Sequence, residues 1–423
     1  MKVTADLHLH SKYSRATSKQ LDIVNLEKWA KVKGINLLGT GDFTHPEWIK
    51  ELKANLSEDG SGILKTKNGF NFILQAEVSL IYSQGGKGRR VHNVLLAPDF
   101  DVVKQVTEYF LKHGRVDYDG RPIFKIPCDE MTYELKKISD DIEVIPAHVW
   151  TPWFSLFGSM SGFDDIEEAF KEQTKNIFAL ETGLSSDPPM NWRLSKLDRF
   201  ALVSCSDSHS FWPWRIGREA TMFELKELTY KNLIKALRTK EGLLGTIEVD
   251  PAYGKYHFDG HRNCKVCLSP KESLKLKNIC PVCGNQLTIG VEHRVEALAD
   301  REEGFKPKGA KDFKRLIPLS EIISSLIGKA AYTKAVWAEF HKLVRDGKSE
   351  LDILLETPFE ELKKAVDEKT AKAIIDSREG KIKVKPGYDG EYGAPLLGGK
   401  PVKEEKIPEP KQKQTGLNQF LNQ

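Results

Sequence analysis

Asp6-Leu7-His8-Leu9-His10, close to the start of the chain, alternates polar and apolar side chains over its whole length. Such alternation is typical of a β-strand, and on a strand His8 and His10 point to the same face. Two imidazoles on one face form half of a metal site, because zinc, manganese and iron all accept imidazole nitrogen. The pair by itself is equally compatible with two solvated or hydrogen-bonded histidines. The other acids and histidines of the chain decide between the two interpretations.

Residues 1–250 alternate between strand-like and helix-like patterns, which favours an α/β fold with a parallel sheet or a βα barrel. In βα barrels the catalytic residues gather at the C-terminal ends of the strands. Acids and histidines stand in or just after the predicted strands, at His8, His10, Asp42, His45, Glu77, His92, His148, Glu181, Asp207 and His209. This regular placement indicates a shared metal centre rather than unrelated polar residues.

The chain closely resembles the PHP (polymerase and histidinol phosphatase) family in its motifs His8-Leu9-His10, Gly41-Asp42, Glu77 and Ser206-Asp207-Ser208-His209. The resemblance covers about residues 1–250 and implies a distorted (βα)7 barrel that holds a trinuclear metal centre. It assigns the first metal to the catalytic set His8, His10, Glu77 and Asp207. It assigns the second metal to Glu77, His92 and His148, and the third to Asp42 and His209.

Two positions depart from the pattern of the family. The family usually reads Thr-Asp-His at its second motif, whereas here Phe43 follows Asp42 and the nearest histidine is His45. A further histidine usually follows the first motif, and Ala16 occupies that place. Both departures concern the third metal, so the sequence leaves the completeness of the site at Asp42, His45 and His209 open.

The ligand types indicate the chemistry of the centre. Imidazole together with carboxylate suits zinc, manganese or iron, and a bridging Glu77 would hold two ions close together. We expect two or three divalent ions (zinc, manganese or magnesium), which activate water and clamp the oxygens of a phosphodiester. Arg89, Arg90 and Arg215 are candidates for contacting the phosphate.

Aromatic residues are concentrated directly after two of the predicted ligands, His148 and His209. The candidates for substrate binding are Trp150, Trp153, Phe154, Trp212, Trp214 and Arg215. For any single tryptophan among them, a place in the core is the favoured interpretation. Together they suggest the walls of a pocket for a planar substrate, because a base extruded from a duplex is held by stacking.

A second kind of metal site is predicted in residues 251–300. Cys264-Lys265-Val266-Cys267 and Cys280-Pro281-Val282-Cys283 are two C-x-x-C knuckles. This spacing is typical of a structural zinc ribbon, so we predict one zinc ion held by Cys264, Cys267, Cys280 and Cys283.

The rest of the chain divides into a helical part and a tail. Amphipathic patterns at 320–327, 333–346, 349–355, 358–366 and 368–378 predict a helical DNA-binding module over 301–397, with a short strand at its end. Residues 398–423 are predicted to be a flexible linker and tail, rich in proline and charge over 398–413. The tail resembles a clamp-binding PIP box in Gln414, Leu417, Phe420 and Leu421, which implies a PCNA-type sliding clamp as partner.

Composition excludes some classes of protein. The 423 residues include 64 Lys and Arg and 60 Asp and Glu, and a net charge of +4 does not by itself indicate a nucleic-acid partner. No stretch approaches the ~20 apolar residues of a membrane span, so no membrane partner is expected. Four of the six cysteines cluster, which favours metal binding in a reducing compartment. Because no signal peptide is recognisable, we expect a cytoplasmic protein.

The full arrangement resembles the lesion-specific DNA endonucleases of the PHP family. That resemblance implies a repair enzyme that binds damaged DNA, flips a base into an aromatic pocket and cuts the phosphodiester 5′ of uracil, hypoxanthine, xanthine or an abasic site. The residue chemistry alone indicates only a multimetal phosphoesterase that handles nucleic acid. The alternatives are a small-molecule phosphatase and a non-catalytic adaptor for DNA or a clamp.

Overall fold

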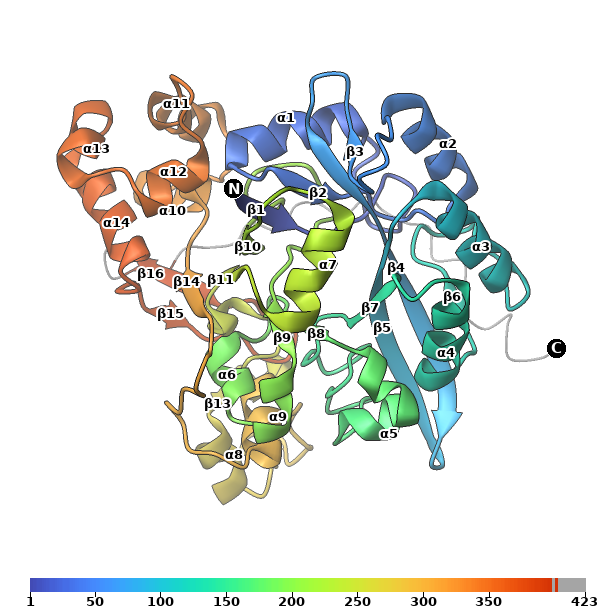
Figure 1. The fold of residues 1–423 in the computed structure, drawn as a ribbon. Coiled ribbons are helices and arrows are strands. Elements are labelled where there is room, and N and C mark those ends of the chain that lie inside the picture. Colours follow the sequence, from blue (N-terminus) through green and yellow to red (C-terminus); the bar gives the residue numbers. More distant parts are fainter. Residues whose placement is uncertain (398–399, 402–423) are drawn as a thin grey trace.

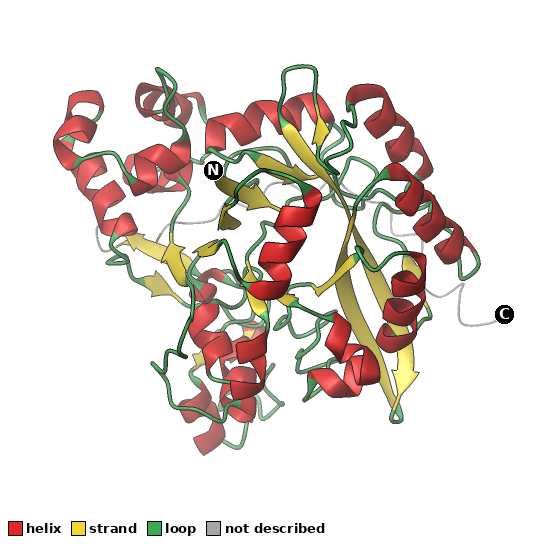
Figure 2. Ribbon diagram, in the orientation of Figure 1, coloured by secondary structure: helices red, strands yellow, loops and turns green. Residues whose placement is uncertain are grey.

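The computed structural model describes residues 1–397 and 400–401, with elements named as in Figure 1. A curled mixed sheet lies at the centre, and helices pack around its outside (Figure 2). The strand order is β14 (Asp312–Arg315), β11 (Leu243–Glu248), β10 (Ala220–Glu224), β1 (Lys2–Asp6), β2 (Leu37–Gly39), β4 (Asn71–Gln84), β5 (Lys87–Ala97) and β7 (Glu143–Pro146). β3 (Leu64–Lys65) and β6 (Ile123–Phe124) also pair with β4, and β8 (Ala179–Glu181) pairs with β9 (Ala201–Val203). The predicted α/β class is confirmed, and the strands expected to form a distorted (βα)7 barrel form a curled, mixed sheet.

The sheet departs from the expected parallel arrangement, because β10 pairs antiparallel with β1 and β11, β5 pairs antiparallel with β7, and β4 and β5 form a long hairpin. β1, β2 and β4 are parallel, but β4 and β5 form an antiparallel pair whose register runs from Leu74 opposite Ala97 to Gln84 opposite Lys87. The turn consists of Gly85 and Gly86, with φ of 60° and 73°. Two consecutive residues with positive φ match the right-handed twist of a hairpin, and glycine adopts them without strain.

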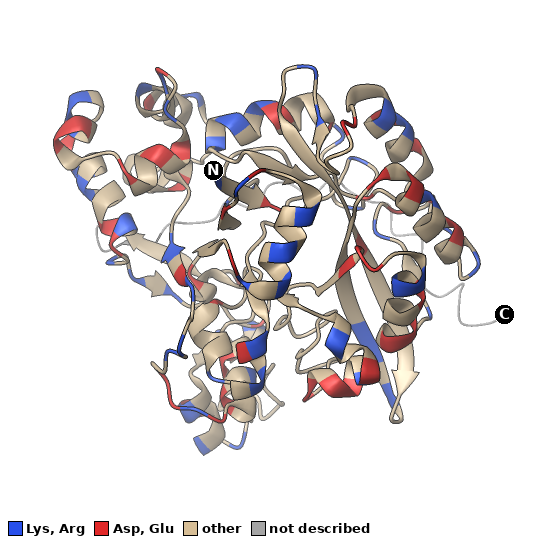
Figure 3. Ribbon diagram, viewed as in Figure 1, with Lys and Arg blue, Asp and Glu red and all other residues tan. Residues whose placement is uncertain are grey.

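The helices around the sheet begin and end at recognisable residues. The Asp22 side chain accepts a hydrogen bond from Asn25 N–H at the start of α1 (Ile23–Lys33), and Gly34, with φ of 99°, ends that helix. Acidic and basic residues are interspersed along the outer helices (Figure 3). The others in this part are α2 (Pro46–Asn55), α3 (Phe100–Leu111), α4 (Cys128–Ile138), α5 (Ile166–Phe170), α6 (Pro188–Trp192) and α7 (Tyr230–Thr239). Short 3₁₀ turns occur at Lys171–Asn176, Ser195–Arg199, Pro251–Tyr253 and Arg262–Cys264.

Two apolar cores lie on opposite faces of the sheet. The larger core fills the space between the sheet and the outer helices. The smaller core contains inward-facing residues such as Val3, Ile73 and Val203, and α7 contributes Leu233 and Leu237 to it. Successive residues of a strand face opposite sides. Ile73 therefore belongs to the inner core, while Phe72 and Leu74 on either side of it belong to the outer core. The inner core and α7 therefore fill the interior of the curled sheet.

A helical region follows the sheet, as predicted. Its elements are α10 (Leu319–Ile327), α11 (Lys334–Leu343), α12 (Glu350–Leu355), α13 (Phe359–Ala365) and α14 (Glu368–Arg378). The residues just before it behave differently, because β14 pairs in parallel with β11 and so extends the central sheet. In the structure the helical region starts at Leu319 rather than at the expected residue 301.

The helical region is fastened to α1 by a buried ion pair. Lys33 Nζ lies 2.8 Å from Glu350 Oε1, and both side chains are buried. The lysine also donates to the backbone oxygen of Pro213, and Glu350 accepts from Leu319 N–H. Removing one partner of a buried pair costs about 3–5 kcal/mol, because the other charge is left uncompensated. The pair therefore ties the helical region to the barrel part of the chain.

The predicted ribbon region contains β12 (Asp259–His261), β13 (Val266–Leu268), α8 (Pro270–Lys275) and α9 (Val291–Leu298). β15 (Val384–Lys385) and β16 (Ala394–Leu397) follow the helices, and β17 (Lys400–Pro401) pairs with β16. The two strand residues of β17 thus lie within the expected linker, residues 398–423. The predicted clamp-binding residues Gln414, Leu417, Phe420 and Leu421 lie outside the described residues. Over residues 1–397 and 400–401, every helix is too short or too polar to traverse a bilayer.

Candidate metal centre

The first group of candidate ligands forms where β1 meets the segment after β9. Leu9 bridges to Ser208 in parallel, and His10 N–H donates to Ser208 O. Asp6 strengthens the junction, because its carboxylate accepts from the N–H groups of Ser206 and Gly217. Burial raises the pKa of Asp6 to about 6. These contacts bring the two histidines of the opening stretch to Asp207.

The imidazoles and carboxylates of this group face one another. His10 Nε2 lies 3.2 Å from both Glu77 Oε2 and Asp207 Oδ1. His8 Nε2 lies 3.6 Å from the same two oxygens. His8 Nε2, His10 Nε2 and Asp207 Oδ1 are buried and have no hydrogen-bond partner among the residues that the structure describes. A divalent cation between them would satisfy all three atoms, so His8, His10, Glu77 and Asp207 fit a metal site.

The second group uses the other oxygen of Glu77. Glu77 Oε1 lies 2.7 Å from His92 Nδ1 and 3.2 Å from His148 Nε2. The hairpin register explains the first contact, since His92 lies opposite Ser79 and therefore on the same face as Glu77. Burial lowers the pKa of His92 to about 4, so the imidazole is neutral at neutral pH and can bind a cation. Glu77 is thus placed to bridge two ions.

Two carboxylates outside these groups hold the imidazoles in orientation. Glu181 Oε1 lies 2.9 Å from His8 Nδ1, and its Oε2 accepts from His148 N–H. Asp42 Oδ1 lies 3.1 Å from His10 Nδ1. A carboxylate can only accept here, so both imidazoles carry their proton on Nδ1 and present Nε2 to the ligand group.

The structure does not bring the predicted third set of ligands together. Asp42 Oδ2 accepts hydrogen bonds from Ser11 and Ser14, which leaves Asp42 as a support for His10. His209 packs beside the His10 ring at 4.5 Å between centroids, whereas the ring of His45 stacks on Tyr13. Among the described residues, no candidate metal group includes Asp42, His45 or His209.

Backbone strain is concentrated at the centre. Asp42, His148 and Asp207 have positive φ values of 45°, 31° and 46°, which are unfavourable for residues with a side chain. Such conformations cost on the order of 1–3 kcal/mol each and persist where the surrounding contacts enforce them. The placement of these three side chains therefore lowers the free energy of unfolding, and contacts elsewhere in the fold must compensate.

Comparison with known proteins shows how far this architecture is shared. The lesion-specific endonuclease PfuEndoQ from Pyrococcus furiosus has a solved structure that is 33% identical to this chain, with a TM-score of 0.84 and 99% of each chain covered. The chain belongs to the endonuclease Q family. A solved complex of endonuclease Q with a 27-mer duplex, carrying an abasic lesion at the active site, also has 33% identity and a TM-score of 0.84. That likeness covers 96% of this chain and 99% of the solved one.

Two further relatives extend the comparison. The Bacillus subtilis protein YqxK is 28% identical over 413 residues, which cover 93% of this chain and 98% of YqxK. The Methanocaldococcus jannaschii protein MJ0043 is 32% identical over 293 residues, or 67% of this chain, but the match spans only 35% of that protein. The family described as the MJ0043 C-terminal domain matches residues 318–381, which correspond to the helical region of this chain.

The predicted aromatic pocket requires correction. Trp150 is fully buried, and its Nε1–H donates to Asn191 Oδ1. Trp214 is also buried and stacks on Trp212 at 5.1 Å. Both pack against Trp337 of α11. These three predicted contacts therefore belong to the core or to the attachment of the helical region, because closeness in sequence to a ligand does not determine which way a side chain faces.

Other predicted substrate contacts remain beside the centre. The Phe154 ring packs on the His92 ring at 4.8 Å, and the exposed Arg90 lies over Phe154. Trp153 is partly exposed and contacts Tyr256 edge-on. Arg215 is also partly exposed. Arg89, in contrast, is buried and donates to the backbone oxygen of Gly162, so it is not free to contact a phosphate.

Sequence reasoning missed Arg121 as a site residue. Its Nη1 lies 2.9 Å from Glu77 Oε2, the oxygen that also faces the first ligand group. Arg121 lies in the loop between α3 and β6, where neither strand nor helix periodicity marks which side chain turns inward. Glu181 was visible as an acid at a strand end, but its role in orienting His8 required the structure.

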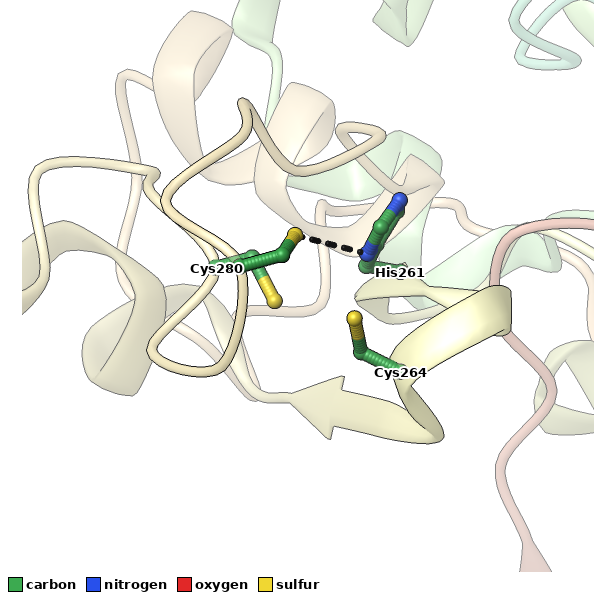
Figure 4. Close-up of side chains that lie close together, drawn as sticks. His261, Cys264 and Cys280 are labelled. Atoms are coloured by element: carbon green, nitrogen blue, oxygen red, sulfur yellow. Dashed lines mark hydrogen bonds between the residues drawn. The ribbon is translucent and has the colours of Figure 1, made fainter.

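The cysteine-rich site differs from the predicted ribbon in one ligand. His261 faces Cys264 and Cys280 (Figure 4), and Cys283 completes the group. The group does not include Cys267. His261 Nδ1 is 3.4 Å from Cys283 Sγ. Cys267 lies opposite Gly260 in the β12–β13 hairpin. The sequence does contain a hint of this ligand. His261 and Cys264 are separated by two residues, the same spacing as between the two cysteines of a C-x-x-C knuckle.

The thiol chemistry of this site suits zinc. Burial opposes ionisation of Cys280, but the backbone N–H groups of Cys283 and Val282 outweigh it and lower the pKa of the thiol to about 6. A thiolate is therefore available at neutral pH. Three cysteines and one histidine form a common set of ligands for a structural zinc ion.

We predict that the fourth zinc ligand is His261 and not Cys267. In chains reconstituted with Co²⁺, Cys267→Ser should retain the thiolate-to-cobalt absorption and the melting temperature of the wild type. His261→Ala should change the absorption and lower the melting temperature, because a structural zinc site contributes directly to folding. Loss of the cobalt spectrum in Cys267→Ser, with His261→Ala unaffected, would show that the C-x-x-C assignment was right.

Proposed function

We propose that this chain is a metal-dependent, lesion-specific DNA endonuclease. The observation that carries the proposal is the placement of Glu77, which offers one carboxylate oxygen to each of two buried ligand groups. The full-length likeness to solved endonuclease Q structures, one of them holding a duplex with an abasic lesion, supports DNA as the substrate class. A small-molecule phosphatase would need neither the cysteine site nor the helical region.

Two divalent ions at such a centre would activate water and stabilise the attacking and leaving oxygens of a phosphodiester. His8, His10 and Asp207 would complete the first site, and His92 and His148 the second. The chain's own contribution is orientation, because Glu181 and Asp42 fix the protonated nitrogens of the two leading histidines. The buried surroundings also limit the access of bulk water to the reacting oxygens.

We further propose that the enzyme cuts the linkage 5′ of deaminated bases (uracil, hypoxanthine and xanthine) and of abasic sites. Deamination changes only the edges of a base, so a duplex must release that base before it can be inspected. Trp153 and Phe154 are both partly exposed, and the Phe154 ring packs on His92. The backbone oxygen of Trp153 accepts from Thr151, whose hydroxyl also contacts His148 Nδ1, so these two residues are the best candidates for the wall of a base pocket. Unstacking costs a few kcal/mol, least for a damaged base.

Asp207→Asn should abolish cleavage and retain binding, because an amide oxygen is a poor substitute for a carboxylate on the first metal. With Mn²⁺ or Mg²⁺, wild-type protein should cut an end-labelled duplex that carries one abasic site, uracil or hypoxanthine. Asp207→Asn should lower kcat/KM by several orders of magnitude. Asp101→Asn, an exposed aspartate of α3, provides the matched control. Near-normal cleavage by Asp207→Asn would refute the metal assignment.

A sliding clamp of the PCNA type is the proposed protein partner. This proposal rests on the spacing of Gln414, Leu417, Phe420 and Leu421, which lie outside the described residues. Leu417 and Phe420 are spaced for one face of a helical turn that a partner can bury. Phe420→Ala should leave the cleavage of short oligonucleotides unchanged and abolish retention on an immobilised clamp, with Asn422→Ala as control. Undiminished retention of the Phe420 variant would place the contact elsewhere.

A further inference from the structure

Arg121 donates directly to a ligand of the metal centre. Its Nη1 donates to Glu77 Oε2 at 2.9 Å, and its side chain keeps 27% of its surface exposed while Glu77 is fully buried. Among the described residues, the guanidinium makes no other hydrogen bond. The remaining donors of a planar fork are therefore free to meet a group that arrives from solvent.

The backbone around Arg121 is held firmly against the centre. Gly120 N–H donates to Tyr13 O, Arg121 N–H donates to Asp119 Oδ1, and Pro122 O accepts from Ser79 N–H. A Cβ at Gly120 would lie 2.2 Å from Asp42 Oδ2, so the loop approaches the supports of His10 as closely as glycine allows. A side chain presented from so fixed a loop loses little conformational freedom on binding.

Metal binding would compete with the present contact of Arg121. Glu77 Oε2 faces His8 and His10, so it is the oxygen that would bind the first ion. With a cation bound there, Glu77 Oε2 would hold less negative charge for Arg121, and the guanidinium would be repelled. The guanidinium of Arg121 would then lack an anionic partner. A DNA substrate supplies one, because the oxygens of a phosphate match the planar fork of a guanidinium.

On the basis of the proposed endonuclease function, we infer that Arg121 binds a non-bridging oxygen of the scissile phosphate. Before the ions and the DNA bind, the hydrogen bond to Glu77 holds the Arg121 side chain beside the centre. This role differs from that of Arg90, which lies over Phe154 at the surface. It also differs from that of a structural counterion, which would serve Glu77 alone and would not respond to the charge of the DNA linkage.

A double-mutant cycle between residue 121 and the charge of the linkage tests this inference. The linkage that wild-type protein cuts in an abasic duplex is mapped first, and then replaced by an uncharged methylphosphonate. Binding is measured by fluorescence anisotropy with Ca²⁺ on protein that keeps Asp207 and the whole first ligand group, under conditions in which a gel shows that the duplex remains uncut. With Arg121 present, the methylphosphonate should weaken binding about ten-fold or more. With Arg121→Gln, the same replacement should cost less than about two-fold, because the charged partner is already missing.

Two further variants make the result decisive. Arg115→Gln, on the same loop, removes an exposed arginine that pairs with Asp117 and should keep the wild-type penalty. Arg121→Lys keeps the charge without the planar fork and should give an intermediate penalty, which keeps the test available if Arg121→Gln does not fold. Arg121→Gln should also reduce the slope of log affinity against log salt by about 1 relative to Arg121.

The outcomes separate this inference from the proposed function. An equal methylphosphonate penalty with arginine and glutamine at position 121 would overturn the phosphate contact and leave Arg121 as a counterion. An equal effect of Arg115→Gln would assign the contact to the loop rather than to Arg121. Failure of wild-type protein to cut any lesion-bearing duplex with Mn²⁺ or Mg²⁺ would instead refute the endonuclease function itself.

Discussion

One buried carboxylate, that of Glu77, links the elements of the centre. Burying an isolated charge costs several kcal/mol, so this carboxylate is tolerated only because cationic or metal-binding partners surround it. Its partners come from the end of β1, from β5, from the end of β7 and from the loop that carries Arg121. Asp207, after β9, joins Glu77 in the first ligand group. A one-residue slip of β5 against β4 would turn His92 to the opposite face. The register of the hairpin is therefore tied to the chemistry of the site.

The remainder of the fold supports this arrangement at two levels. Glu181 and Asp42 orient the histidines directly, and the strained backbone at His148 and Asp207 places the ligands at positions that relaxed strand ends would not reach. Apolar packing provides the compensating stability. The inner core with α7 fills the curled sheet, so the polar centre has a rigid surrounding. Because the ligands depend on this strained backbone, we expect substitutions in the loops after β7 and β9 to be poorly tolerated.

Most of the centre could be predicted from the sequence, because histidines and acids recur at the ends of successive predicted strands. Alternation fixed the common face of His8 and His10, and the ligands recur in or after strands, which is where βα folds place their catalytic residues. Prediction from the sequence failed where a residue's role depends on the direction in which a loop side chain points. Trp150 points into the core, and Arg121 turns inward from a loop without periodicity. At the cysteine site, spacing favoured Cys267, whereas the hairpin geometry gathers His261 with the other three ligands.

The central claim is that Glu77 bridges two metal ions. Anomalous diffraction from crystals soaked in Mn²⁺ measures this directly, because it locates each ion independently of the protein atoms. We predict two peaks about 3.5–4 Å apart, one beside His8, His10 and Asp207 and one beside His92 and His148, with a Glu77 oxygen on each. A single peak, or two peaks that do not share Glu77, would contradict the account.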